Sequence, residues 1–267
     1  MFRILSLFIV FGLFMSACST VPMTGRKQVS LISNSELSSL SDQEYKQIIS
    51  TSKIEKGTKN AQMVNEVGQK IAKAVEEFFT ETNQADKISE FSWEFNLIKD
   101  DKTVNAFCMP GGKIVVYTGI LPVTKNKEGL AVIMGHEVAH AVANHGAERM
   151  SQQMLAGAGQ TALGYATQEQ SENTKQLINT AYGVGAQVGL LLPYSRLHES
   201  EADHIGLILM AKAGYDPRYA VTFWTDMKNM SSSANKTMAL LSTHPSDDKR
   251  IEDIKRLLPD ALKYYKK

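Results

Sequence analysis

The sequence predicts an α+β fold that is mainly helical, and three observations lead to this class. Apolar and polar residues alternate over residues 91–97, as in a half-buried strand. Two more strand candidates, residues 103–109 and 113–119, flank a turn at residues 110–112 and predict a hairpin. From Lys127 onward, apolar residues recur at helical spacing almost to the end of the chain. A small sheet beside many helices follows from this pattern.

Composition narrows the class of protein. The chain has 267 residues, with 29 Lys and Arg against 28 Asp and Glu, and 43% of its residues are hydrophobic. A chain of this length can bury a full core, and its apolar content excludes a largely disordered chain. A formal charge of +1 lacks the clear basic excess of a nucleic-acid-binding domain. We therefore expect a globular protein with no nucleic-acid partner.

The N-terminus has the pattern of a bacterial lipoprotein signal. Arg3 precedes an apolar run over residues 4–15, which is shorter than the ~20 residues of a membrane span but has the length of a signal-peptide core. The segment Met15-Ser16-Ala17-Cys18 resembles a lipobox. It predicts a lipoprotein signal peptide over residues 1–17 and lipidation of Cys18. A simple cleaved signal and an uncleaved anchor are the alternatives.

Lipidation of Cys18 has consequences for redox state and localisation. Cys108 is then the only other thiol, so no intramolecular disulfide is expected. Ser19 follows the anchor where Asp would signal inner-membrane retention. By resemblance to lipoprotein sorting rules, we expect an outer-membrane lipoprotein that faces the periplasm.

The mature chain is expected to form one domain behind a tether. Residues 18–60 are polar and include a predicted helix over residues 34–49, which we interpret as a tether and a peripheral helix. The domain proper is expected over residues 61–267. Its first element is an amphipathic helix, predicted by apolar residues at helical spacing, namely Val64, Val67, Ile71, Ala74, Val75 and Phe78.

The helical part after Lys127 is expected to contain breaks. Proline and glycine predict them at Pro193, at residues 214–217 and at residues 243–245. The stretch 156–189 is rich in Gly and Ala and polar in its middle, so it is the segment that we expect to be least rigid.

The motif His136-Glu137-Val138-Ala139-His140 is the first that indicates chemistry. Residues four apart on a helix are about 40° apart around its axis, so both imidazoles can reach a single Zn²⁺. Glu137 lies about 60° from His140, within reach of a water at that ion. The alternative, two core histidines with an incidental glutamate, would require polar partners inside an apolar helix. The motif therefore predicts a zinc site with His136 and His140 as ligands.

A catalytic zinc normally takes three protein ligands, and residues 199–203 offer the third. Glu199 and Asp203 are four apart, and an apolar helix continues after them. One carboxylate could bind the metal while the other accepts the second ring N–H of a ligand histidine. Glu201 is kept as the alternative ligand. The competing interpretation is a solvated acidic helix start, where carboxylates favour the helix dipole.

Four segments together resemble peptidase family M48. They are residues 105–112 with the strand that follows, residues 135–140, residues 194–203, and residues 242–246 with Arg250-Ile251 after them. They follow the family's order and cover roughly residues 60–258. The length and the lipobox resemble the branch that contains periplasmic lipoprotein peptidases and Oma-type proteases.

The resemblance implies a zincin-like metallopeptidase domain with one Zn²⁺ per chain. It implies that Glu199 is the zinc ligand and that Asp203 supports a ligand histidine. Zn²⁺ would activate a water and polarise the scissile carbonyl, with Glu137 as the general base that passes a proton to the leaving amine.

An oxyanion stabiliser is also needed, and the candidates are Tyr194, His244 and Arg250. By similarity to one lipoprotein branch of the family, His244 could instead occupy the open zinc position and hold the enzyme inactive. A third interpretation of His244 is a loop residue that caps the next helix. The other histidines, His145, His198 and His204, are expected at the surface or around the site.

The expected function is a zinc-dependent endopeptidase of the bacterial cell envelope that cleaves misfolded or envelope proteins. The strand after Gly112 is expected to pair with extended substrate through main-chain hydrogen bonds. Other envelope proteases or assembly machinery are expected partners, and the membrane is reached through lipidated Cys18. The alternatives are an envelope chaperone or assembly factor with secondary or self-inhibited proteolysis, and a zinc-dependent hydrolase of non-peptide substrates.

Overall fold

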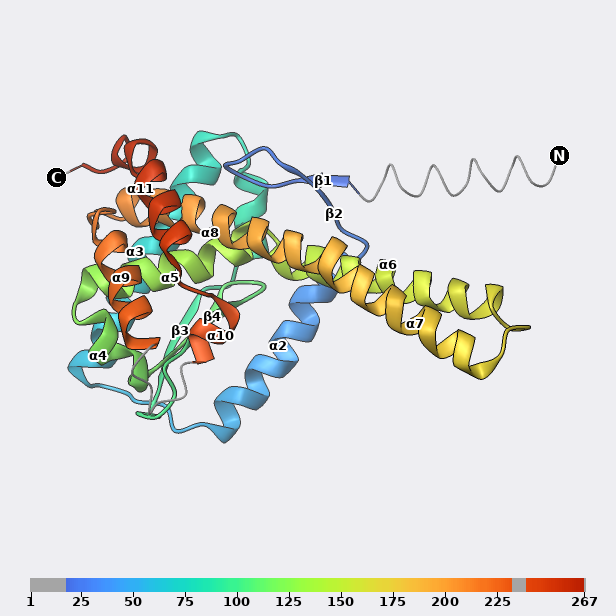
Figure 1. Cartoon of the computed structure of the whole chain (residues 1–267). Helices are drawn as coiled ribbons and strands as arrows, with labels where there is room; N and C mark the ends of the chain where they lie inside the picture. Colours follow the sequence, from blue (N-terminus) through green and yellow to red (C-terminus); the bar gives the residue numbers. More distant parts are fainter. Residues whose placement is uncertain (1–17, 232–238, 267) are drawn as a thin grey trace. The chain divides into compact units, whose positions relative to one another are not determined.

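The computed structural model describes residues 18–231 and 239–266, and it has the mainly helical α+β fold that the sequence predicts (Figure 1). The predicted signal peptide, residues 1–17, lies outside the described residues. Across the described ranges, no helix combines the length and the apolar character that a membrane span requires. The strands are β1 (Cys18–Thr20), β2 (Lys27–Val29), β3 (Glu94–Ile98), β4 (Ala106–Met109) and β5 (Lys113–Tyr117).

The helices follow the predicted order along the chain. They are α2 (Asn34–Thr51), α3 (Lys59–Glu81), η1 (Ala85–Glu90), η2 (Thr118–Ile120), α4 (Leu121–Thr124), α5 (Lys127–Val142), α6 (His145–Ala166), α7 (Glu172–Ala186), η3 (Gln187–Leu191), α8 (Leu192–Lys212), α9 (Tyr219–Ser231), α10 (Ala239–Thr243) and α11 (Asp248–Leu262).

The chain divides into two compact units. Among the described residues, one consists of residues 18–33 and 144–198, and the other of residues 34–143, 199–231 and 239–266. The division falls within α8, between His198 and Glu199. The tether and the single peptidase domain expected from the sequence stay predictions.

The larger unit contains a three-stranded sheet in the order β3-β5-β4. β4 and β5 form the predicted antiparallel hairpin, which closes at the pair Met109↔Lys113. β3 runs parallel to β5 and begins at Glu94, three residues after the start of the predicted strand. The earlier residues bond to the hairpin turn instead, since the Ser92 N–H donates to the Gly111 carbonyl.

The two sides of this sheet differ. Beside β3, Ile54 forms an antiparallel bridge with Ile98, and the Glu55 N–H donates to the Leu97 carbonyl. On the other side, β4 is the edge strand, and α5 packs against it. The edge strand therefore lies next to the helix that carries the His-Glu-x-x-His motif.

The core of this unit forms where α3 and α5 pack together. All six apolar residues that predicted the amphipathic helix are buried on α3. α5 is buried on every side from Gly129 to Ala139, as its continuous apolar sequence requires. The Asn126 side chain accepts a hydrogen bond from the Gly129 N–H at 3.0 Å and so caps the start of α5.

The smaller unit contains the β1–β2 pair and a helical hairpin of α6 and α7 (Figure 1). The Tyr182 hydroxyl of α7 donates to the Ala156 carbonyl of α6 at 2.9 Å. Near the start of α6, Arg26 donates to both carboxylate oxygens of Glu148, at 2.9 and 2.6 Å, and His198 Nε2 lies 2.9 Å from Glu148 Oε2.

This buried polar cluster corrects the expectation for two histidines. His145 and His198 are not at the surface; both are buried, and their rings stack with centroids 4.3 Å apart. Burial raises the pKa of Glu148, but its hydrogen bonds with His198 and Arg26 outweigh burial and lower that pKa to about 2. The cluster can be buried because each charged group has an opposite or polar partner.

The helix breaks follow the prediction except at Pro193. α8 ends at Lys212 before the loop that leads to α9, and α10 ends at Thr243. At Pro193 the chain stays helical, with the π-helical turn η3 directly before α8. A π turn widens the backbone ladder, which lets a helix accommodate a residue that disturbs the regular i→i−4 hydrogen bonding.

Candidate metal centre

α5 presents its two motif histidines on one side. The Nε2 atoms of His136 and His140 lie 3.2 Å apart, and His136 is buried. The ring planes cross at 83° with centroids 4.8 Å apart, so the two rings converge through their Nε2 edges. The helical spacing of four residues is enough to produce this pair.

α8 brings the carboxylates because it crosses α5 at two glycines. A Cβ atom added to Gly135 would lie 3.0 Å from the Gly206 carbonyl oxygen, and one added to Gly206 would lie 2.9 Å from the His136 nitrogen. Only residues without a side chain allow the two backbones to approach this closely. The crossing places Glu199 and Asp203 opposite the histidines of α5.

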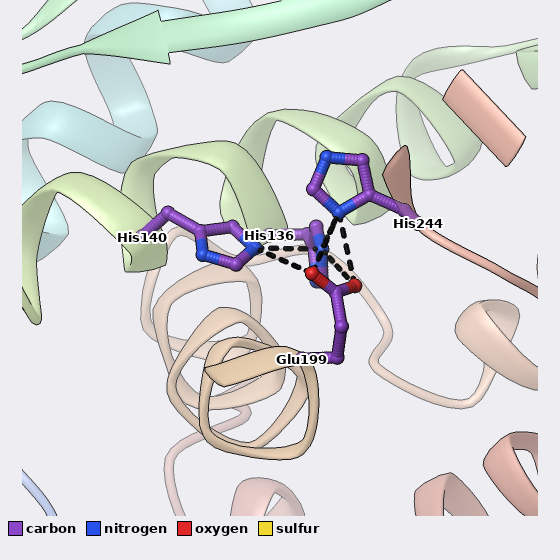
Figure 2. Close-up of side chains that lie close together, drawn as sticks. All are labelled: His136, His140, Glu199 and His244. Atoms are coloured by element: carbon purple, nitrogen blue, oxygen red, sulfur yellow. Dashed lines mark hydrogen bonds and ion pairs between the residues drawn. The ribbon is translucent and has the colours of Figure 1, made fainter. Parts of the chain in front are cut away.

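Four side chains converge on one point, as Figure 2 shows: His136 and His140 from α5, Glu199 from α8, and His244 after α10. One potential ligand atom from each lies within 4.8 Å of all the others. The Nε2 atoms of His136 and His140 lie 3.3 and 3.4 Å from the Glu199 carboxylate. His244 Nδ1 lies 2.9 Å from Glu199 Oε2 and 3.1 Å from His136 Nε2.

These separations match a metal polyhedron. Ligand atoms at about 2.0–2.1 Å from a tetrahedral Zn²⁺ are separated by roughly 3.3 Å. Imidazole nitrogens and a carboxylate are also the ligand types that zinc takes. The four side chains therefore fit a single Zn²⁺ without a change of rotamer.

Asp203 orients the His136 ring from the side opposite the cluster, through the Nδ1 atom. Its Oδ1 lies 3.0 Å from His136 Nδ1 and can only accept, so the proton is on Nδ1 and the Nε2 lone pair faces the cluster. Arg250 in turn holds Asp203 through two hydrogen bonds, at 2.9 and 2.8 Å. The Arg250 guanidinium lies 3.4 Å above the Trp224 ring, which fixes its position on the other side.

The electrostatics of the cluster favour a cation. Burial lowers the pKa of His136, but hydrogen bonds to Asp203 and Glu199 outweigh burial and raise that pKa to about 9. Burial raises the pKa of Glu199, and hydrogen bonds with His136, His140 and His244 reverse this and hold it well below its usual range. Without a metal, the site attracts a proton to His136; with Zn²⁺, the same negative charge stabilises the ion.

Glu137 is held differently from the other carboxylates. It is buried, and its Oε1 accepts no hydrogen bond from the described residues; His244 Nε2 lies 3.4 Å from that oxygen. Burial raises its pKa, against the opposing effect of His244 and His136. A buried carboxylate oxygen without a hydrogen bond is the expected position for a group that handles protons.

Most of the predicted site residues are brought together, and others lie elsewhere. Glu201 is two residues from Glu199, about 200° around the helix, and lies outside the cluster. Arg250 contacts Asp203 and Trp224, and its Nη1 also lies 3.5 Å from Glu199 Oε2, so it lies against the cluster and helps to position the cluster's members. Tyr194 belongs to the smaller unit, where its ring lies 6.3 Å from that of His198. The oxyanion roles of Tyr194 and Arg250 stay predictions.

Two features of the site, a tryptophan and a close contact between two glycines, were not predicted from the sequence. Trp224 stacks on Arg250 and meets the His136 ring edge-on at 5.6 Å, yet no motif marks it. The Gly135–Gly206 crossing was also missed, although one glycine directly before His136 and another three residues after Asp203 are the signal that could have found it. Both act by setting the position of His136.

Comparisons with known proteins give consistent matches. A family model described as Peptidase family M48 matches residues 64–258. Mitochondrial metalloendopeptidase OMA1 of Schizosaccharomyces pombe is 40% identical over 174 residues, which are 65% of this chain and 49% of that protein. Metalloendopeptidase OMA1 of Homo sapiens is 32% identical over 266 residues, 96% of this chain and 48% of that protein.

A bacterial relative matches a shorter part of this chain than the human protein does. Beta-barrel assembly-enhancing protease of Yersinia pestis is 29% identical over 168 residues, which are 60% of this chain and 33% of that protein. The chain spans about half the length of the first curated relatives that it matches.

Proposed function

The chain belongs to peptidase family M48 and has the metalloendopeptidase site of that family, and we propose that it is a zinc-dependent endopeptidase of the bacterial cell envelope that cleaves misfolded or envelope proteins. The observation that carries the proposal is the convergence of His136, His140 and Glu199 beside the buried Glu137. A mainly helical α+β fold with a small sheet agrees with a zincin-like peptidase.

The donor set supports zinc as the metal. His136, His140 and Glu199 would hold it, since two neutral imidazoles and a carboxylate form the ligand set of known zinc peptidases. When bound, Zn²⁺ supplies Lewis acidity to a peptide carbonyl and to a water.

The other steps, proton transfer, orientation of a ligand and binding of the substrate, are assigned to residues of the chain itself. Glu137 is placed to accept a proton from a water and return it to the leaving amine, because its carboxylate is buried beside the cluster and its Oε1 has no hydrogen-bond partner among the described residues. Asp203, held by Arg250, favours the proton of neutral His136 on Nδ1, so that the Nε2 lone pair can serve as a ligand. The edge strand β4 lies beside α5 and offers main-chain groups to an extended substrate.

His244 supports a self-inhibited form of this enzyme. With His244 Nδ1 among the donors, four protein side chains surround one point, as in structural zinc sites, whereas catalytic sites keep one position for water. The loop is held in place, since Ser246 donates to the Trp224 carbonyl at 2.8 Å and Arg250 to the Pro245 carbonyl at 2.9 Å. We expect substrate or a partner to displace His244 before cleavage.

Replacing His244 with Ala should raise kcat/KM for an unstructured protein substrate. The reason is that the fourth position is vacated while His136, His140 and Glu199 still hold the metal. A closed state favoured by ~1.4 kcal/mol predicts about a tenfold increase. The measurement is cleavage of a casein-type substrate at equal zinc content.

A matched control is His204→Ala on α8, because His204 lies outside the cluster and its nearest carboxylate is Asp260 at 4.0 Å. Activity of that variant should stay within about twofold. A decrease in the His244 variant at full zinc content would instead indicate that His244 assists the reaction.

The envelope location rests on the lipobox that ends at Cys18. Cys18 is exposed, which suits acylation, and β1 continues directly from it. We propose that Cys18 is lipidated and that the protein is attached to the outer membrane on its periplasmic side. Envelope proteases or assembly machinery are proposed partners, in keeping with a relative named as a beta-barrel assembly-enhancing protease.

Cys18→Ser in the full chain should leave the precursor unprocessed or the protein in the soluble fraction of a bacterial host. Fractionation and the mass of the N-terminal peptide measure this, with Cys108→Ser as the control for loss of a thiol. Unchanged membrane partition and an unmodified Cys18 in the parent chain would contradict lipidation.

The second candidate function is an envelope chaperone or assembly factor whose proteolysis is secondary. The observation that favours it is the place of His244 in the cluster, which closes the site. If the protein is such a factor, the Glu137→Gln variant should still bind client proteins, and the His244→Ala variant should still show no cleavage.

A further inference from the structure

The outer face of α7 carries large apolar side chains that the described chain leaves exposed. Leu177 is 70% exposed, and Val184 and Val188 are each 60% exposed. With Ala181, which is also exposed, they form what we call the outer seam. Single exposed apolar residues are ordinary, but a contiguous row on one helix indicates an interaction surface.

The spacing of the outer seam is that of a helix-packing surface. Its members follow at intervals of four, three and four residues, which keeps the three on α7 within about 60° around the helix axis, and Val188 follows in the π turn η3. Tyr182 lies about 140° from Leu177 and bonds to α6, so α6 packs on the opposite side of α7. α7 therefore has one side that faces α6 and a second, apolar side that nothing described covers.

The sequence around the outer seam contains no charged residues. Residues 176–195 contain no Asp, Glu, Lys, Arg or His. The charged side chains nearest in sequence are Lys175 before this stretch and Arg196 after it. An uncharged stretch that starts in α7 and runs through η3 lets two identical helices approach without repulsion between like charges.

We propose that the outer seam is the surface through which two copies of this chain associate, with α7 and η3 of one copy packed against α7 and η3 of the other. A stripe at intervals of three and four residues fits another helix, as in left-handed coiled coils. A membrane-surface helix instead has a broad apolar face flanked by Lys and Arg, and no Lys or Arg lies in residues 176–195.

The size of the outer seam sets the strength of the association. α7 and η3 together span Glu172–Leu191, which is about 30 Å of helix at ~1.5 Å per residue, and a helix is about 10 Å wide. A strip of this size buries several hundred Å² on each copy, at the lower end of stable interfaces. We therefore expect a dimer with a dissociation constant on the order of micromolar.

A cysteine at the centre of the outer seam tests the contact in the full chain. In membranes of an expressing host, Val184→Cys should form an oxidant-induced dimer at least tenfold more than Gln176→Cys. Gln176 is also exposed on α7 but lies off the seam. Because Val184 is central, it meets its own copy in parallel and antiparallel pairing alike. The parent chain, with Cys18 and Cys108, gives the background.

Opposite charges at one position give the decisive measurement. Full chains with two different affinity tags are co-expressed, and the recovery of one tag with the other is measured. Val184→Lys with itself, and Val184→Glu with itself, should recover at least tenfold less than the parent pair. The mixed Lys and Glu pair should return to within about threefold of the parent, because the charges then attract.

The outcomes separate this proposal from its rivals and from the peptidase assignment. Unchanged recovery in every combination overturns it. Equal loss in the mixed pair, as expected if lipid or an unfolded client covers the outer seam, also overturns it. None of the readouts requires zinc or cleavage, so failure of the proposed peptidase function would leave this test intact.

Discussion

Replacing Glu137 with Gln is expected to lower kcat/KM by about 10²–10⁴-fold, the usual contribution of a general base, while zinc stays at one ion per chain. The carboxylate lies beside the four-residue cluster but is not one of its members. Burial raises its pKa, so it takes up a proton more readily than an exposed glutamate. An amide of the same size fills the same space and cannot take up that proton. Cleavage of a casein-type substrate and metal analysis on the same sample measure both effects.

The control for this variant is Glu128→Gln in the first turn of the same helix. It removes a carboxylate from α5 without touching the cluster, so activity should stay within about twofold. If Glu137→Gln keeps both its zinc and its activity, the assignment of Glu137 as the base is wrong. If it loses zinc as well, the loss of activity says nothing about proton transfer, and anomalous scattering from a zinc-soaked crystal would then locate the ion.

Replacing Glu199 with Gln is expected to weaken zinc binding by more than about 100-fold. The Glu199 carboxylate lies within 3.4 Å of nitrogens from all three cluster histidines, so its loss removes the only negative ligand. Residues that only support a ligand typically cost 10–100-fold when replaced, so a larger loss identifies a direct ligand. Competition with a chelator of known affinity gives the dissociation constant.

Glu201→Gln is the matched comparison, on the same helix and with the same change of charge. Because Glu201 lies on another face of α8 and outside the cluster, zinc affinity should change by less than about threefold. The reverse pattern, with zinc lost in Glu201→Gln and kept in Glu199→Gln, would transfer the ligand role to Glu201.

Much of the site was accessible from the sequence where a single helix sets the geometry. His136 and His140 converge because four residues on any α-helix bring side chains to one face. The amphipathic pattern of α3 and the turn of the β4–β5 hairpin are equally local, and both were predicted in place. The break expected at Pro193 was wrong, since the chain stays helical there, with the π turn η3 directly before α8.

The smaller unit was the least predictable part. His145 and His198 were expected at the surface or around the site, yet both are buried, and His198 Nε2 lies 2.9 Å from the Glu148 carboxylate that also accepts from Arg26. These partners lie up to 122 residues apart in the chain, and no short spacing links them. Burial of a charged group depends on a partner from another segment, so it cannot be read from one segment alone.

The sequence by itself determined the helical pair of histidines, the adjacent glutamate and the apolar helices around them, because these follow from periodicity within one element. Residue spacing alone left Glu199, Asp203 and Glu201 open as the third ligand, the family resemblance pointed to Glu199, and the tertiary structure places Glu199 in the cluster. The glycines of α5 and α8 set how closely the helices cross, and at that crossing Glu199 joins the cluster while Glu201, which is also buried, stays outside it. It also decided that His244 joins the donors and that Arg250 lies between Asp203 and Trp224. The physical reason is that backbone spacing fixes directions along a helix, whereas contacts between helices depend on packing that only the whole fold establishes.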